Sequence, residues 1–139
     1  MDELTIDARV GNLNMVVRFI AERLEAAGCS MKQQAQMTIA AEEVFVNIAL
    51  YAYGQSGGSA TVRVSVDDEV AVEFEDCGKP YNPIDKKDPD ITVGADGREI
   101  GGLGVFMVKK LMDSVEYKRA GEKNILTLKK KLAPALAFA

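Results

Sequence analysis

The stretch that decides the fold runs from residue 61 to residue 76 and reads TVRVSVDDEVAVEFED. Apolar and polar residues alternate on both sides of residues 67–69, as they do in strands with one buried and one wet face. The acidic triplet between the two segments is typical of a turn, so the stretch predicts an antiparallel hairpin. Asp76 has the same parity as the apolar residues of the second strand, so it is expected on the buried face.

Two helices are predicted before the hairpin. From 13 to 27, apolar residues recur at steps of three and four, which favours an amphipathic helix. Gly28 ends it, and Ser30 is placed to cap a second helix from about 31 to 53. Beyond Met37 this helix is apolar on nearly every side, which is typical of a buried helix. Residues 3–9 alternate and predict an edge strand ahead of both helices.

A long connection follows the hairpin. Residues 77–104 contain three of the four prolines and six glycines, and loops of this length are often functional. A third helix from residue 105 and strands at about 114–119 and 124–131 complete the pattern. Because strands and helices are segregated, the sequence predicts one α+β domain over residues 1–139. We expect a two-layer α/β sandwich, with a mainly antiparallel, mixed sheet covered on one face by about three helices.

Composition excludes several classes of function. The chain has no histidine and two cysteines, which excludes Ser/His or Cys/His nucleophile pairs and argues against a zinc site. The net charge is −4 and the basic cluster at 129–131 stands alone, so nucleic acid is not an expected partner. No apolar stretch approaches membrane-spanning length and the first residues do not resemble a signal peptide, so we expect a cytoplasmic protein without membrane contact.

Glu43 and Asn47 are the first polar candidates, because they are four residues apart on one helix face. They share that face with Ile39, Val46 and Leu50, which predicts that both polar groups point towards the core. A buried carboxylate needs partners. The alternatives are a functional pair, a hydrogen-bonded pair within the core, or an imprecise helical register.

Asp76 and a glycine cluster are the other candidates. The segment from Asp76 to Pro80 is compatible with an ordinary turn, or with a carboxylate that accepts a hydrogen bond from a ligand amino group. The cluster Gly101-Gly102-Leu103-Gly104 precedes the third helix, where backbone N–H groups can approach a phosphate. A glycine cluster alone is a weak signal, and neither a Rossmann nor a Walker motif is present.

Together, Glu43-x-x-x-Asn47, Asp76-x-Gly78-x-Pro80 and the glycine cluster 101–104 resemble the N, G1 and G2 boxes of the GHKL (Bergerat-fold) ATPases, in the same order. The resemblance covers about residues 5–132. The short length, the helix before the N box and the run GGLGVFMVKKLMD at 101–113 are most similar to anti-sigma factor serine/threonine protein kinases of bacterial partner-switching systems.

The resemblance implies a role for each motif. It makes Glu43 the general base, Asn47 a Mg²⁺ ligand and Asp76 the acceptor for the adenine amino group of ATP. Gly78 would let the base approach, and the phosphates would be held by Gly101, Gly102, Leu103 and Gly104. Residues 83–100 would form the ATP lid, with Lys86, Lys87 or Arg98 as candidate γ-phosphate contacts.

One position departs from the family pattern. Relatives such as gyrase place a threonine near the adenine early in the last strand, where this chain has Ile125. Either the register is shifted by two residues, towards Thr127, or the contact is missing.

The function implied by the resemblance is an ATP-dependent protein serine kinase that acts as an anti-sigma factor. Its partners would be a STAS-type anti-anti-sigma protein, which it phosphorylates, and a sigma factor, which it sequesters; a homodimer is expected. One alternative is an ATP-binding regulatory module that holds a partner without phosphorylating it. Another is a detached ATPase domain of a sensor kinase.

Overall fold

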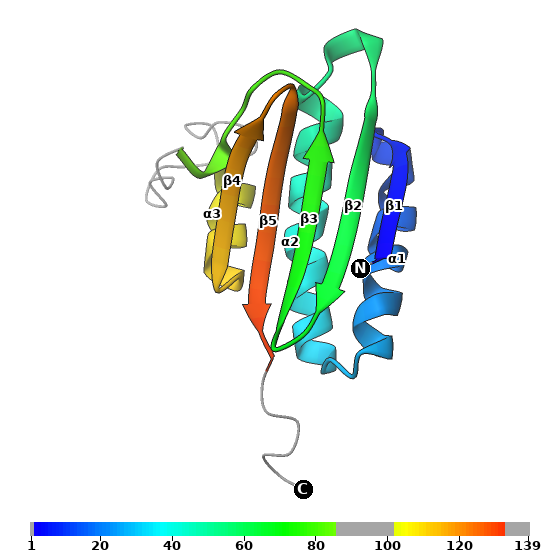
Figure 1. Ribbon diagram of the computed structural model, residues 1–139, viewed down its shortest axis with the longest axis vertical. Coiled ribbons are helices and arrows are strands. Elements are labelled where there is room, and N and C mark those ends of the chain that lie inside the picture. Colours follow the sequence, from blue (N-terminus) through cyan, green and yellow to red (C-terminus); the bar gives the residue numbers. More distant parts are fainter. Residues whose placement is uncertain (1, 86–101, 133–139) are drawn as a thin grey trace, which may run out of the picture.

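The computed structural model describes residues 2–85 and 102–132. Figure 1 shows five strands and the helices behind them. The strands are β1 (Asp2–Asp7), β2 (Ser59–Val66), β3 (Glu69–Asp76), β4 (Ser114–Ala120) and β5 (Lys123–Lys131). The α-helices are α1 (Leu13–Ala26), α2 (Met31–Tyr51) and α3 (Gly102–Leu111), and the short 3-10 turns are η1 (Val10–Asn12), η2 (Gly54–Ser56) and η3 (Pro83–Asp85).

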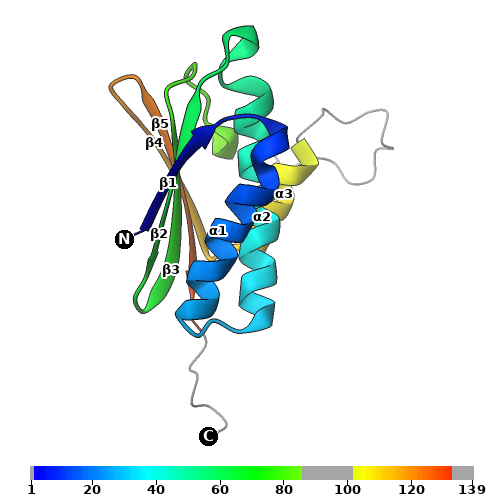
Figure 2. The ribbon, with the colours of Figure 1, turned by 90° about the vertical axis from the view of Figure 1, so that its right-hand side faces the viewer.

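The strands form one sheet in the order β1-β2-β3-β5-β4, with β1 and β4 at its edges. All four strand pairs are antiparallel, so the described sheet has no parallel pair and is not mixed. Seen from the side, α1, α2 and α3 lie on the same face of the sheet (Figure 2). The α+β two-layer sandwich predicted from the sequence is therefore confirmed.

The central hairpin forms as its alternation predicts. Val62 pairs with Phe74 and Ala60 with Asp76 across β2 and β3, and every second residue of β3 is buried. Asp76 lies on this buried face, with only 5% of its surface exposed. The parity argument for Asp76 is confirmed. A carboxylate therefore lies at the end of a central strand, on the face that the helices cover.

Helix α2 begins where the sequence indicates. The Ser30 side chain accepts a hydrogen bond from the Gln33 backbone N–H at 3.1 Å, and the Gln33 side chain accepts one from the Ser30 N–H at 3.0 Å. This reciprocal capping box satisfies two N–H groups that a helix start would otherwise leave unpaired. The helix then runs antiparallel to α1, and both pack on the sheet.

The orientation of α2 differs from the prediction. Its buried residues are Met37, Ala40, Ala41, Val44, Phe45 and Ile48. Ile39 and Leu50, expected on the core face with Glu43 and Asn47, are 42% and 51% exposed. The helix has apolar residues on several sides, so its periodicity does not fix its rotation. Glu43 and Asn47 are half-buried at the border of the core instead of inside it.

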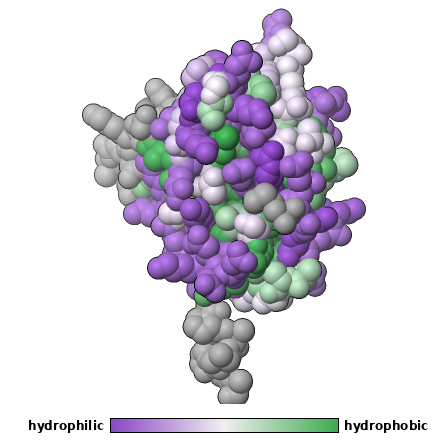
Figure 3. Space-filling view, viewed as in Figure 1, coloured by the Kyte–Doolittle hydropathy of each residue, from purple (hydrophilic) through white to green (hydrophobic). Residues whose placement is uncertain are grey.

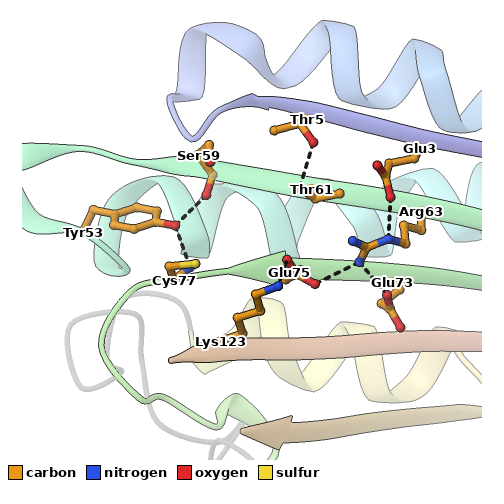
Figure 4. Close-up of polar contacts among 10 residues, drawn as sticks. All are labelled: Glu3, Thr5, Tyr53, Ser59, Thr61, Arg63, Glu73, Glu75, Cys77 and Lys123. Atoms are coloured by element: carbon orange, nitrogen blue, oxygen red, sulfur yellow. Dashed lines mark hydrogen bonds and ion pairs between the residues drawn. The ribbon is translucent and has the colours of Figure 1, made fainter. Parts of the chain in front are cut away.

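The face of the sheet away from the helices carries much polar surface (Figure 3). At its centre, Arg63 bonds Glu3 at 2.7 Å, Glu73 at 2.9 Å and Glu75 at 3.0 Å (Figure 4). Lys123 adds an ion pair to Glu75 at 3.3 Å. Although burial raises the pKa of Glu75, the hydrogen bonds and charges of Arg63 and Lys123 outweigh it and hold the pKa below its ordinary value. These contacts tie four strands together on the open face.

Helix α3 starts earlier than expected. The sequence placed the glycine cluster ahead of the helix, but α3 begins at Gly102, so Gly104 lies in its first turn. Across the described residues, no helix combines the length and the apolar character needed to cross a membrane.

Candidate functional site

A pocket of about 680 Å³ of empty space, including its open mouth, lies between α2, α3 and one end of the sheet. Its walls are mostly apolar, with Val44 and Ile48 from α2, Val105 and Val108 from α3, and Leu126 from β5. Its polar lining includes Asn47, Lys79, Tyr81, Lys109, Asp76, Tyr117 and Asn124. An apolar cleft with a few convergent polar groups has the form of a small-molecule site.

Asp76 supplies the buried carboxylate of this pocket. Its Oδ1 accepts two hydrogen bonds, from the Gly78 backbone N–H and from the Asn124 Nδ2, both at 2.9 Å. Within the described residues Oδ2 has no hydrogen-bond partner. The turn interpretation and the ligand interpretation of Asp76 are therefore compatible, because one oxygen closes the turn while the other remains free to accept from a bound group.

Asn124 is a site residue that the sequence reasoning missed. It pairs with Asp76 across β3 and β5 and is 6% exposed. The residues of β5 that face the helices are Asn124, Leu126 and Leu128. Both positions considered for the threonine of the family, Ile125 and Thr127, instead line a groove on the opposite face. Asn124 could have been found from the sequence, because it has the same strand parity as the apolar residues Leu126 and Leu128 and is therefore expected on the same buried face.

The loop after Asp76 is tied down at several points. The Lys79 N–H donates to the Ala52 carbonyl at 3.1 Å, and the Arg119 Nη1 donates to the Gly78 carbonyl at 2.8 Å. At the edge of the loop the Tyr53 hydroxyl accepts from the Cys77 N–H at 2.7 Å (Figure 4). Burial raises the pKa of Tyr53, which keeps the phenol protonated. The loop is thus a fixed wall of the pocket.

Gly78 is required by close packing. A Cβ placed there would lie 2.6 Å from the Ala52 Cβ and would collide with the Ala52 carbonyl. Since the neighbour is backbone, the contact cannot be relieved by a side-chain rotation. The segment after β3 can approach the end of α2 this closely only with glycine at this position.

Glu43 and Asn47 lie one turn apart on α2, and their positions differ. Asn47 lines the pocket, whereas Glu43 lies against the first turn of α3. A Cβ on Gly104 would be 2.9 Å from the Glu43 Cδ, so this glycine makes room for the carboxylate. Glu43 is therefore held between two helices, next to the α3 N-terminal turn, where the N–H groups favour negative charge.

Part of the predicted site lies outside the described residues. This applies to Gly101 and to the lid candidates Lys86, Lys87 and Arg98. Gly102 and Leu103 belong to the first turn of α3. Of the predicted residues, the structure brings Asn47 and Asp76 to one pocket, with Gly78 beside it, and places Glu43 with Gly104 on the neighbouring α2–α3 contact.

The arrangement suits a nucleotide with its metal ion. The apolar walls fit a base, the free oxygen of Asp76 fits an amino group, and the α3 N-terminal turn fits a phosphate. No group of three His, Cys, Asp or Glu side chains capable of holding a metal occurs in the described part of the chain. The Asn47 amide that lines the pocket offers an oxygen donor of the kind that Mg²⁺ takes besides substrate phosphates and water.

Comparisons with known proteins agree with this geometry. The model of the family described as histidine kinase-like ATPase domain matches residues 6–130. A serine-protein kinase RsbW from Halalkalibacterium halodurans is 30% identical over 128 residues, covering 84% of this chain and 74% of the relative. A serine/threonine-protein kinase BtrW from Bordetella bronchiseptica is 28% identical over 101 residues, covering 70% of each chain. The RsbW of Listeria monocytogenes serovar 1/2a is 30% identical, with 61% of its length covered.

Solved structures share the fold. The RsbU and RsbW domains of a Mycobacterium tuberculosis protein match 97% of this chain and 34% of that one, with a TM-score of 0.63 and 18% identity. The SiaB-SiaC complex from Pseudomonas aeruginosa matches 91% of this chain and 88% of that one, with a TM-score of 0.55 and 13% identity. The chain therefore belongs to the histidine kinase-like ATPase family, and within it to the group of the RsbW and BtrW serine-protein kinases.

Proposed function

We propose that this chain binds ATP with Mg²⁺ in the pocket between α2 and α3 and transfers the γ-phosphoryl group to a serine or threonine of a partner protein. By resemblance to the anti-sigma kinases, the partner is a STAS-type anti-anti-sigma protein. The unphosphorylated partner would release a sigma factor that the kinase, acting as a homodimer, otherwise holds.

One observation carries the proposal: the buried Asp76 presents an oxygen without a partner to an apolar pocket. Because this oxygen belongs to a residue that lines the pocket and accepts no hydrogen bond from the described protein, a ligand in the pocket can donate a hydrogen bond to it. The adenine amino group is such a donor.

The position of Glu43 supports phosphoryl transfer rather than binding alone. In the proposed step Glu43 accepts the proton of the partner's hydroxyl, the bond between that oxygen and the γ-phosphorus forms, and the bond to the β-phosphate oxygen breaks. The electron pair of the broken bond stays on the β-phosphate oxygen of ADP, which then leaves. Asn47, one turn away, would hold Mg²⁺, which neutralises phosphate charge. The protein mainly positions groups and supplies donors at the α3 N-terminal turn.

ATP binding is tested with Asp76→Asn by calorimetry in the presence of Mg²⁺. The existing network orients the amide oxygen of the new residue towards Gly78 and Asn124, so its NH₂ group faces the adenine amino group. We expect ATP affinity to fall roughly 10- to 100-fold. Asp68→Asn, in the exposed hairpin turn, is the matched control. Undiminished binding by Asp76→Asn, or no binding by the native chain, would refute the site.

Phosphoryl transfer is tested with Glu43→Gln. The substitution keeps the shape but removes the base, so ATP binding should persist while the transfer rate falls about 10²- to 10⁴-fold. The measurement is transfer of labelled γ-phosphate to each STAS-domain protein of the source organism. A native chain that binds ATP yet labels none of them is a nucleotide-gated binding module, and unaltered transfer by Glu43→Gln would exclude Glu43 as the base.

A further inference from the structure

Asn124 is hydrogen-bonded at every position that its side chain offers. Its Nδ2 donates to the Asp76 Oδ1 and to the Lys79 carbonyl, both at 2.9 Å. Its Oδ1 accepts from the Tyr117 hydroxyl at 2.5 Å and from the Tyr81 backbone N–H at 3.4 Å. Two donors and two acceptors are the full capacity of an amide, so these four partners fix which way the Asn124 side chain is turned.

Because the orientation of the Asn124 amide is fixed, each hydrogen bond of the network has a fixed donor and a fixed acceptor. Tyr117 donates to Asn124, and Asn124 donates to Asp76. If the Asn124 amide rotated by half a turn, its oxygen would face two acceptors, the Asp76 carboxylate and the Lys79 carbonyl, and its NH₂ group would face the Tyr81 N–H, which cannot accept. Asp76 and Asn124 are the two buried polar side chains of the described residues, and such interactions are stronger in a low dielectric.

The consequence falls on the free oxygen of Asp76. Because Oδ1 is occupied by two donors, the carboxylate cannot rotate without breaking both hydrogen bonds, so Oδ2 keeps a fixed position as an acceptor on a residue that lines the pocket. Carboxylates rotate easily about their last torsion when nothing holds them, which would spread the position of this oxygen. An acceptor in a fixed position distinguishes ligands with an amino group from those without one.

On the basis of the function proposed above, we propose that Asn124 and Tyr117 are positioning residues for base recognition. They act through Asp76, and they make the pocket selective for a purine with a 6-amino group over one without it. Tyr117 is two steps from the base, and its effect on affinity passes through Asn124.

The test compares two ligands, ATP and purine riboside triphosphate, which lacks the 6-amino group. Their binding with Mg²⁺ is measured by calorimetry for the native chain, Tyr117→Phe and Asn124→Ala. Tyr117→Phe removes one hydroxyl and keeps the ring, so it remains informative if Asn124→Ala folds poorly. Thr5→Val, which removes a hydroxyl bonded to Thr61 on the open face of the sheet, is the control.

We expect the native chain to prefer ATP. In Tyr117→Phe the affinity for ATP should fall roughly three- to tenfold while the affinity for purine riboside triphosphate stays the same, and Asn124→Ala should lose more of the preference. Thr5→Val should keep the preference of the native chain.

The other outcomes separate this inference from the proposed function. If both variants keep the native preference, or lose affinity for both ligands equally, then Asn124 and Tyr117 have no positioning role, although ATP binding stands. If the native chain binds both ligands equally, selection of the amino group is refuted. If it binds neither, the proposed function fails and the inference fails with it.

Discussion

At the scale of single residues, Gly78 is the position where the least change should have the largest effect. A methyl group there meets the backbone of Ala52, so Gly78→Ala must displace the loop or the end of α2. Overpacking of this kind costs about 1–3 kcal/mol. We expect a lower unfolding free energy and weaker ATP binding, because the Gly78 N–H also bonds Asp76.

Gly11→Ala is the matched control for this prediction. Nothing lies within 4 Å of a Cβ at Gly11, so this substitution should leave both properties near their native values. Urea unfolding and ATP calorimetry measure the two effects. Equal behaviour of the two variants would contradict the close packing at Gly78.

For single residues, the sequence predicted which face of the sheet a side chain occupies wherever the alternation of apolar and polar residues within one strand decides it. Asp76 could be placed because three apolar residues of known parity precede it in β3. Asn124 has the same relation to Leu126 and Leu128, but the family pattern directed attention to Ile125 and Thr127. Glu43 and Gly104 belong to two helices that are far apart in the sequence. No local sequence pattern could predict that these two residues are in contact.

At the scale of elements, α2 carries the catalytic and metal candidates at one end and its capping box at the other. Ser30→Ala removes the acceptor for the Gln33 N–H and should cost about 1 kcal/mol of unfolding free energy. Asn47 is about 25 Å further along the helix axis at 1.5 Å per residue, so ATP affinity should not change.

Lys32→Ala is the control for the capping prediction, since Lys32 is exposed in the same first turn. It should unfold like the native chain in urea. If Ser30→Ala weakened ATP binding, the two ends of α2 would have to be coupled.

The elements themselves were largely predictable because their signals are local. Alternation gave the hairpin, Ser30 gave the start of α2, and the three-four periodicity gave α1. The rotation of α2 was not predictable, because Ile39 and Leu50 are as apolar as the residues that face the sheet. Only packing against α1, α3 and the strands selects its buried side.

At the scale of the whole molecule, the charges on the open face make stability depend on pH. The folded-state pKa of Glu75 lies below its ordinary value of 4.5, since Arg63 and Lys123 outweigh the effect of burial. Its contribution is therefore fully present above about pH 4.5 and is lost as the pH falls through the folded-state pKa. Glu75→Gln should show a smaller loss of stability between pH 6 and about pH 3 than the native chain.

Urea unfolding midpoints at several pH values measure this difference. Glu122→Gln, which removes an exposed carboxylate in the β4–β5 turn, controls for the change of net charge. The same acid sensitivity in Glu75→Gln and the native chain would mean that the Arg63 cluster does not contribute to acid stability.

The pairing of β3 with β5 also has a consequence for how the protein is made. Asp76 and its partner Asn124 are 48 residues apart. At about 5–20 residues per second, a ribosome needs roughly 2–10 s to synthesise the chain between them. During that interval the β2–β3 hairpin is present with the β3 side unpaired, and the proposed base-recognition site does not yet exist. Nucleotide can therefore stabilise only a chain whose synthesis has passed β5, and it cannot assist the earlier stages of folding.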